Sequence, residues 1–194
     1  MSVIANPTGP MLSWSPSAKG GFVESPLEVL TAELESLVEL VGGVSDEQYA
    51  MRPVGPFESS IGAHVRHCLD HIVAFLGGLE TSRIDYELRE RGTEVESSRR
   101  AAGVKIQRLL RRAADARDRS MDHPVGVTAM LTKVGPPVEV ESSVGRELVF
   151  TLSHTTHHNA MIAAMAKLLG IETPPGFGVA PSTAAYHDRA RCAR

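Results

Sequence analysis

Six of the eight histidines in this 194-residue sequence fall in two short windows, and imidazole is the commonest metal-ligating side chain in proteins. The windows read His64-Val-Arg-His67-Cys-Leu-Asp-His71 and His154-Thr-Thr-His157-His158. Residues four apart on a helix share a face, so His154 and His158 would present two imidazoles to one point. A histidine of the first window would then complete a three-ligand site. Three protein ligands leave positions for water or a substrate, as in catalytic metal centres.

The spacing alone leaves alternatives open. The His154 and His158 pair is predicted to share the apolar face of its helix with Phe150 and Met165, where each imidazole needs a hydrogen-bond partner. A metal-free polar core is therefore the competing interpretation, although two converging histidine windows favour a metal site. The turn between the paired histidines lacks the glutamate of an H-E-x-x-H motif, which disfavours metalloprotease chemistry. On helical periodicity His64 lies nearest the apolar stripe of its helix, so the third ligand stays open.

Four amphipathic segments must position these histidines. Apolar residues at three- and four-residue spacing predict helices from Ser25 to Gly43, from Ser59 or Ser60 to Gly78, from Ser97 to Arg119, and from Ser142 or Ser143 through Leu169. Residues 81–95 are charged and expected to be irregular, and alternating apolar residues at 125–129 and 138–140 predict a short hairpin. We expect an all-α four-helix bundle with this β-hairpin before the last helix. Residues 1–24 would form an N-terminal arm, residues 25–180 the bundle and residues 181–194 a C-terminal tail. After the last helix, residues 171–194 are expected to be loop and tail without regular structure.

Composition and charge disfavour several classes of protein. Twenty Lys and Arg against 23 Asp and Glu give a net charge of −3, so no basic field would attract nucleic acid or an anionic membrane. No apolar run approaches the ~18 residues that a spanning helix needs, and the N-terminus lacks the apolar core of a signal peptide. Two cysteines cannot form a disulfide framework, and Cys68 lies in an apolar stripe where packing is favoured over redox chemistry. We expect a cytoplasmic protein.

Two segments resemble the motifs of the DinB-like (YfiT-like) superfamily of metal-dependent enzymes. They are Ser60-Ile-Gly-Ala-His-Val-Arg-His67-Cys-Leu-Asp-His71 and Leu152-Ser-His154-Thr-Thr-His157-His158-Asn159. The resemblance covers roughly residues 25–180 and implies an up-down-down-up bundle, with a divalent metal on His67, His154 and His158. His64 and His71 are then candidates for supporting the ligands or facing the substrate, and His157 is undecided between those roles and none. Glu147, two turns before His154, is a candidate orienter or proton acceptor, with a solvated or capping role as the alternative.

The first functional hypothesis is a metal-dependent transferase or hydrolase, in which a divalent ion on three histidines activates a thiol or water. The resemblance implies relatives that use low-molecular-weight thiols, so the expected partner is a small-molecule substrate such as a thiol. The ion would be zinc, nickel, iron or manganese, because imidazole suits several such metals. The alternatives are a non-catalytic metal-binding bundle and a small-molecule-binding bundle without metal. No nucleic-acid or membrane partner is expected, and a homodimer through the bundle surface is compatible with the sequence.

Overall fold

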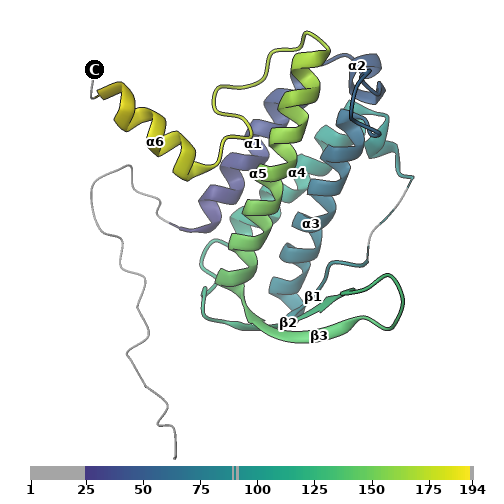
Figure 1. Cartoon of the computed structure of the whole chain (residues 1–194). Helices are drawn as coiled ribbons and strands as arrows, with labels where there is room; N and C mark the ends of the chain where they lie inside the picture. Colours follow the sequence, from purple (N-terminus) through teal and green to yellow (C-terminus); the bar gives the residue numbers. More distant parts are fainter. Residues whose placement is uncertain (1–24, 89, 91, 193–194) are drawn as a thin grey trace, which may run out of the picture.

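The computed structural model describes residues 25–88, 90 and 92–192 and is mostly helical (Figure 1). The predicted N-terminal arm, residues 1–24, lies outside the described residues. In chain order the elements are α1 (Leu27–Gly43), α2 (Asp46–Ala50), α3 (Ile61–Thr81), β1 (Arg83–Asp85), the 3-10 turn η1 (Glu94–Glu96), α4 (Arg99–Asp115), β2 (Pro124–Ala129), β3 (Val138–Ser143), α5 (Val144–Leu168) and α6 (Pro181–Cys192). Within the described part of the chain, no helix is both long and apolar enough to cross a bilayer.

The four long helices α1, α3, α4 and α5 run side by side (Figure 1). α1 contacts α4 and α5, and α3 contacts the same two helices. Their apolar stripes meet in one core, in which Leu34, Ile72, Ile106 and Ile162 (one from each helix) have no exposed surface. This core holds α3 against α5, and these are the two helices that carry the histidine windows.

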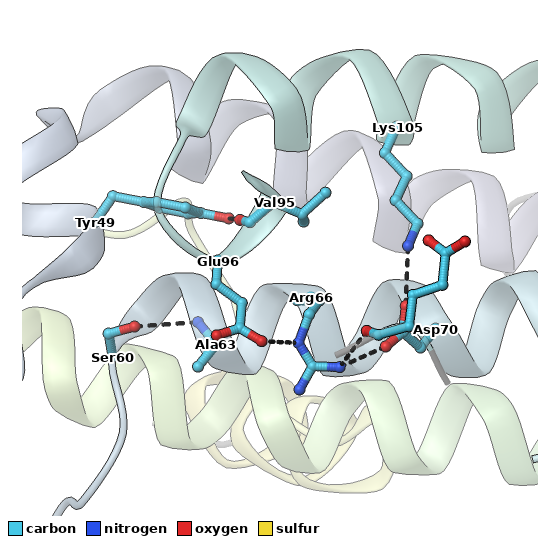
Figure 2. Close-up of polar contacts among 9 residues, drawn as sticks. Tyr49, Ser60, Ala63, Arg66, Asp70, Val95, Glu96 and Lys105 are labelled. Carbon is cyan, nitrogen blue, oxygen red and sulfur yellow. Dashed lines mark hydrogen bonds and ion pairs between the residues drawn. The ribbon is translucent and has the colours of Figure 1, made fainter. Parts of the chain in front are cut away.

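Serine side chains begin three of these helices. The Oγ atoms of Ser60, Ser98 and Ser143 each accept a hydrogen bond from the backbone N–H three residues further on, at 3.2, 3.2 and 3.3 Å. Figure 2 shows the first of these caps at the start of α3. Such caps satisfy backbone donors that have no partner inside the helix. They mark where α3 and α5, the helices that carry the histidine windows, begin.

A three-stranded sheet lies at one end of the long helices, with its strands in the order β1-β2-β3 (Figure 1). β2 and β3 are antiparallel and lie where alternating apolar residues were expected. β1, by contrast, corrects the expectation that residues 81–95 are irregular, because it pairs parallel with β2. Its central residue, Ile84, is fully buried against Gly78 of α3, where an added Cβ would lie 2.1 Å from Ile84 Cγ1. A glycine on α3 therefore makes room for a strand that periodicity did not indicate.

The C-terminal residues also differ from the expected loop and tail, since Pro181–Cys192 forms α6. None of its residues is buried, and Figure 1 shows it directed away from the long helices. Proline suits the first position of a helix and alanine has the highest helix propensity, so local sequence accounts for α6 without tertiary packing.

A network of charged side chains ties α3 to α4 and η1 (Figure 2). The Asp70 side chain, only 4% exposed, accepts hydrogen bonds from Arg66 Nη1 at 2.5 Å and from Lys105 Nζ at 2.9 Å. Arg66 also pairs through Nε with Glu96 of η1. Since Asp70 lies between His67 and His71 in the sequence, this network fixes the stretch of α3 that presents both histidines.

Candidate metal centre

Five histidines from α3 and α5 gather in one cluster. The ring centroid of His67 lies 4.8 Å from those of His71 and His154. The His71 and His154 rings stack with centroids 3.8 Å apart. His158 completes the group, with its centroid 4.6 Å from those of His67 and His154 and 5.2 Å from that of His64. The two windows therefore meet between the helices, as the sequence predicts.

The histidine face of α5 is not its most buried face. Thr151, Thr155 and Asn159 have no exposed surface and point into the core, whereas His154 and His158 are half-buried. The sequence placed the paired imidazoles on the apolar face of their helix. In the structure they lie beside the fully buried stripe of α5 instead. Four of the five clustered histidines are therefore partly exposed, and His71 is buried.

Three of the clustered histidines fit the requirements of a metal ion. His67, His71 and His154 each offer a ring nitrogen, and these atoms all lie within 4.8 Å of one another. Ligand nitrogens around a tetrahedral zinc ion lie about 3.4 Å apart, given Zn–N bonds of 2.0–2.1 Å. Modest rotations of the three side chains would bring their ring nitrogens from the present spacing to that of a zinc site. The three histidines therefore suit an ion that prefers imidazole ligands.

His158, the third ligand implied by the resemblance, makes a different contact. Its Nδ1 atom lies 3.0 Å from Nδ1 of His64, so one of these two nitrogens carries the shared proton. Burial, together with the nearby imidazoles of His154, His64 and His157, lowers the pKa of His158 to about 4. His158 is therefore neutral at neutral pH, the form in which imidazole binds metals. If His158 is the donor to His64, its Nε2 atom keeps a lone pair for an ion.

Tyr86 is a neighbour of the cluster that sequence reasoning missed. Its ring stacks on His71 with centroids 5.2 Å apart, and its hydroxyl donates a hydrogen bond of 2.9 Å to Glu147 Oε2. Tyr86 follows β1, and its backbone N–H donates to Thr128 O of β2 at 3.4 Å. It reaches the cluster only because β1 pairs with β2. The alternation of Ile84 and Tyr86 was the available signal for this strand.

Glu147 is 1% exposed and reaches the histidines through Tyr86. Its Oε1 atom accepts hydrogen bonds from Ser142 Oγ at 2.6 Å and from Arg146 Nη1 at 2.8 Å. A buried carboxylate is stable only with such partners. Glu147 therefore orients the ring that stacks on His71.

His157 lies at the margin of the cluster, where its ring contacts that of His158. Its side chain is exposed, and its ring centroid is 5.3 Å from that of His158. It lines a separate cleft between α1 and α5.

Cys68 follows His67 in the sequence but faces the opposite way, into the core. It has no exposed surface, and burial raises the pKa of its thiol to about 12. Because the thiolate is the reactive form, we expect Cys68 to resist alkylation in the folded protein while the exposed Cys192 reacts. Iodoacetamide labelling followed by mass spectrometry checks this, with one modified thiol before unfolding and two after. Equal rates at both cysteines in the native protein would show that the α3 core opens.

A family model described as the DinB superfamily matches residues 30–162. Among curated proteins, FK506-binding protein 5 of Rhizopus delemar is 33% identical over 101 residues, which cover 52% of this chain and 26% of that protein. The chain thus matches about a quarter of the length of that relative. Among solved structures, the crystal structure of a DinB-like protein from Bacillus cereus ATCC 10987 has a TM-score of 0.53 at 16% identity, covering 78% of this chain and 95% of that one.

Proposed function

The chain belongs to the DinB superfamily, and on that premise we propose that it is a metal-dependent enzyme acting on a small thiol or on water. The observation that carries the proposal is the meeting of His67, His71 and His154, whose ring nitrogens lie within 4.8 Å of one another. The proposal includes the up-down-down-up four-helix bundle for α1, α3, α4 and α5, with β2 and β3 as the hairpin before α5.

His67 and His154 belong to both candidate ligand sets. The third ligand is His158 on the resemblance and His71 on the distances between ring nitrogens. A divalent zinc, nickel, iron or manganese ion held there supplies Lewis acidity, which lowers the pKa of a thiol or water that binds to it. Three protein ligands leave a position for that molecule.

The remaining side chains have supporting roles. His64 holds the ring of His158 through the contact between their Nδ1 atoms. Tyr86 and Glu147 hold the ring of His71 from the other side. Groups that orient metal ligands commonly contribute to metal affinity as much as to fold. Burial and the nearby imidazole of His157 lower the pKa of His64, so His64 is neutral at neutral pH and suited to accept a proton from the reacting thiol or water. If His158 is the third ligand, His71 is the other candidate for that role.

The test is a thiol-transfer assay on protein prepared without a histidine tag. Metal is removed with a chelator and restored as zinc, nickel, iron or manganese. Cysteine and other small thiols are then offered with 1-chloro-2,4-dinitrobenzene, where a carbon–sulfur bond forms while chloride and a proton leave. We expect at least one metal-loaded form to transfer thiol faster than the metal-free protein does. If every loaded form matches the metal-free protein and metal only raises the melting temperature, thiol transfer fails and the non-catalytic metal-binding alternative is favoured.

The pair formed by Tyr86 and Glu147 gives a prediction of its own. Tyr86→Phe keeps the ring on His71 but removes the hydroxyl that donates to Glu147, and we expect the metal affinity to fall about tenfold. Competition against a chromophoric chelator measures that affinity. Tyr186→Phe, on the exposed α6, is the matched control and should leave the metal affinity unchanged. Equal affinities for the two variants would remove Tyr86 from the account of the site.

A further inference from the structure

A second cleft lies where α1 and α5 meet the segment that leads into α6. Its volume is about 490 Å³, within the range of small-molecule sites. The walls are largely apolar and include Val29 of α1 together with Val149 and Leu152 of α5. Glu33 and His157 bring polar groups into these walls. The cleft therefore combines an apolar lining with a few polar atoms, the pattern typical of a binding pocket.

One wall of the cleft is held in place by a close backbone approach. Gly178 has φ 71°, and a Cβ at this position would lie 2.4 Å from the backbone nitrogen of Ala160 on α5. The preceding residue, Phe177, is buried in the main core. Only glycine allows this contact, so the segment lies directly against α5 and shapes the cleft.

Glu33 is the group in this cleft that lacks a counter-charge. Its Oε2 atom accepts a hydrogen bond of 2.9 Å from Nδ2 of Asn159, a residue with no exposed surface. Within residues 25–88, 90 and 92–192, no cationic side chain forms an ion pair with Glu33. Burial raises the pKa of its carboxyl, and the bond from Asn159 opposes that rise. A carboxylate set among apolar walls attracts a cation and repels an anion.

We propose that this cleft is a second small-molecule site, and that it takes a ligand with an apolar body and a protonated amine. The ammonium group lies against the carboxylate of Glu33, and the apolar body lies against Val29, Val149 and Leu152. This site adjoins the histidine cluster at His157, but it does not depend on a metal. His157, which the metal centre leaves unused, lines it.

The test uses three probes of one length and different charge, which are hexylamine, hexanol and hexanoate. Each is titrated into ¹⁵N-labelled full-length protein with EDTA present, so that binding of the amine to a metal is not measured. We expect hexylamine to give saturable shifts of the Val29, Val149 and Gly178 amides, hexanol to bind more weakly, and hexanoate to give no saturable shift. Glu33→Gln removes the negative charge that pairs with the ammonium group. It should therefore weaken the binding of hexylamine about tenfold.

Glu35→Gln, an exposed position on the same helix, is the matched control and should leave hexylamine binding unchanged. Val149 is 67% exposed, so Val149→Phe can narrow the cleft without disturbing the core, and it should also weaken hexylamine. Thermal melting verifies that each variant is folded. Equal binding of the three probes, equal hexylamine affinity in Glu33→Gln and wild type, or no saturable shift at the cleft amides would each overturn the proposal.

Discussion

Replacing His154 with alanine is expected to lower the affinity of the protein for a divalent ion by more than about 100-fold. Loss of a group that merely orients a ligand commonly costs 10–100-fold, and His154 would be a ligand itself in either candidate set. The helix should tolerate the change, since His154 is half-buried and alanine favours helix. Competition with a chromophoric chelator measures the affinity, and circular dichroism verifies the fold.

The same helix supplies the control. His157→Ala alters an exposed histidine of the same window and should keep the wild-type affinity. His71→Ala and His158→Ala then identify the third ligand, because only the ligating histidine should match the loss seen with His154→Ala. Wild-type affinity in His154→Ala would place the ion elsewhere and remove the cluster as the metal centre.

The second large effect is on stability. Asp70→Ala should lower the free energy of unfolding by about 3 kcal/mol, because removing one partner of a buried ion pair leaves charge without compensation. Both Arg66 and Lys105 lose a carboxylate that is 4% exposed (Figure 2). Arg66 keeps its pair with Glu96, which holds the effect at the lower end of the range for such pairs. Urea unfolding followed by circular dichroism measures the change.

A surface ion pair provides the comparison. Arg83 and Glu139 also form an ion pair, but their side chains are 69% and 53% exposed. Glu139→Ala should therefore lower the free energy of unfolding by less than about 1 kcal/mol. If Asp70→Ala costs no more than Glu139→Ala, the network does not anchor α3, and the positions of His67 and His71 need another explanation.

Helical spacing was enough to predict that His154 and His158 lie together on one side of α5. His154 and His158 are one turn apart, and any helix through them brings both imidazoles to one side. The choice of partner on α3 is a different matter, since it depends on the rotation of one helix against another. Periodicity favoured His64 and the resemblance implied His67. The structure brings His67 and His71 toward His154, and pairs His64 with His158.

The contacts that join distant segments could not be predicted from the sequence. Tyr86 reaches His71 only through the parallel pairing of β1 with β2, more than 40 residues away along the chain. Ile84 packs on Gly78 in the same way, through a tertiary contact that leaves little trace in local periodicity. On α5, Thr151, Thr155 and Asn159 are fully buried beside apolar residues such as Ile162 and Met165, so hydrophobicity alone did not locate the centre of the buried face. α6, by contrast, follows from local helix propensity. The expectation of a tail gave that propensity too little weight.

The most direct test of the central claim is the metal content of protein purified without a histidine tag. Inductively coupled plasma mass spectrometry, combined with protein quantification, gives the number of metal ions per chain. The measurement is made before and after dialysis against zinc, nickel, iron or manganese. A metal centre on the α3 and α5 histidines predicts one divalent ion per chain in wild type and almost none in His154→Ala. Wild-type protein that holds no stoichiometric ion after every dialysis would contradict it.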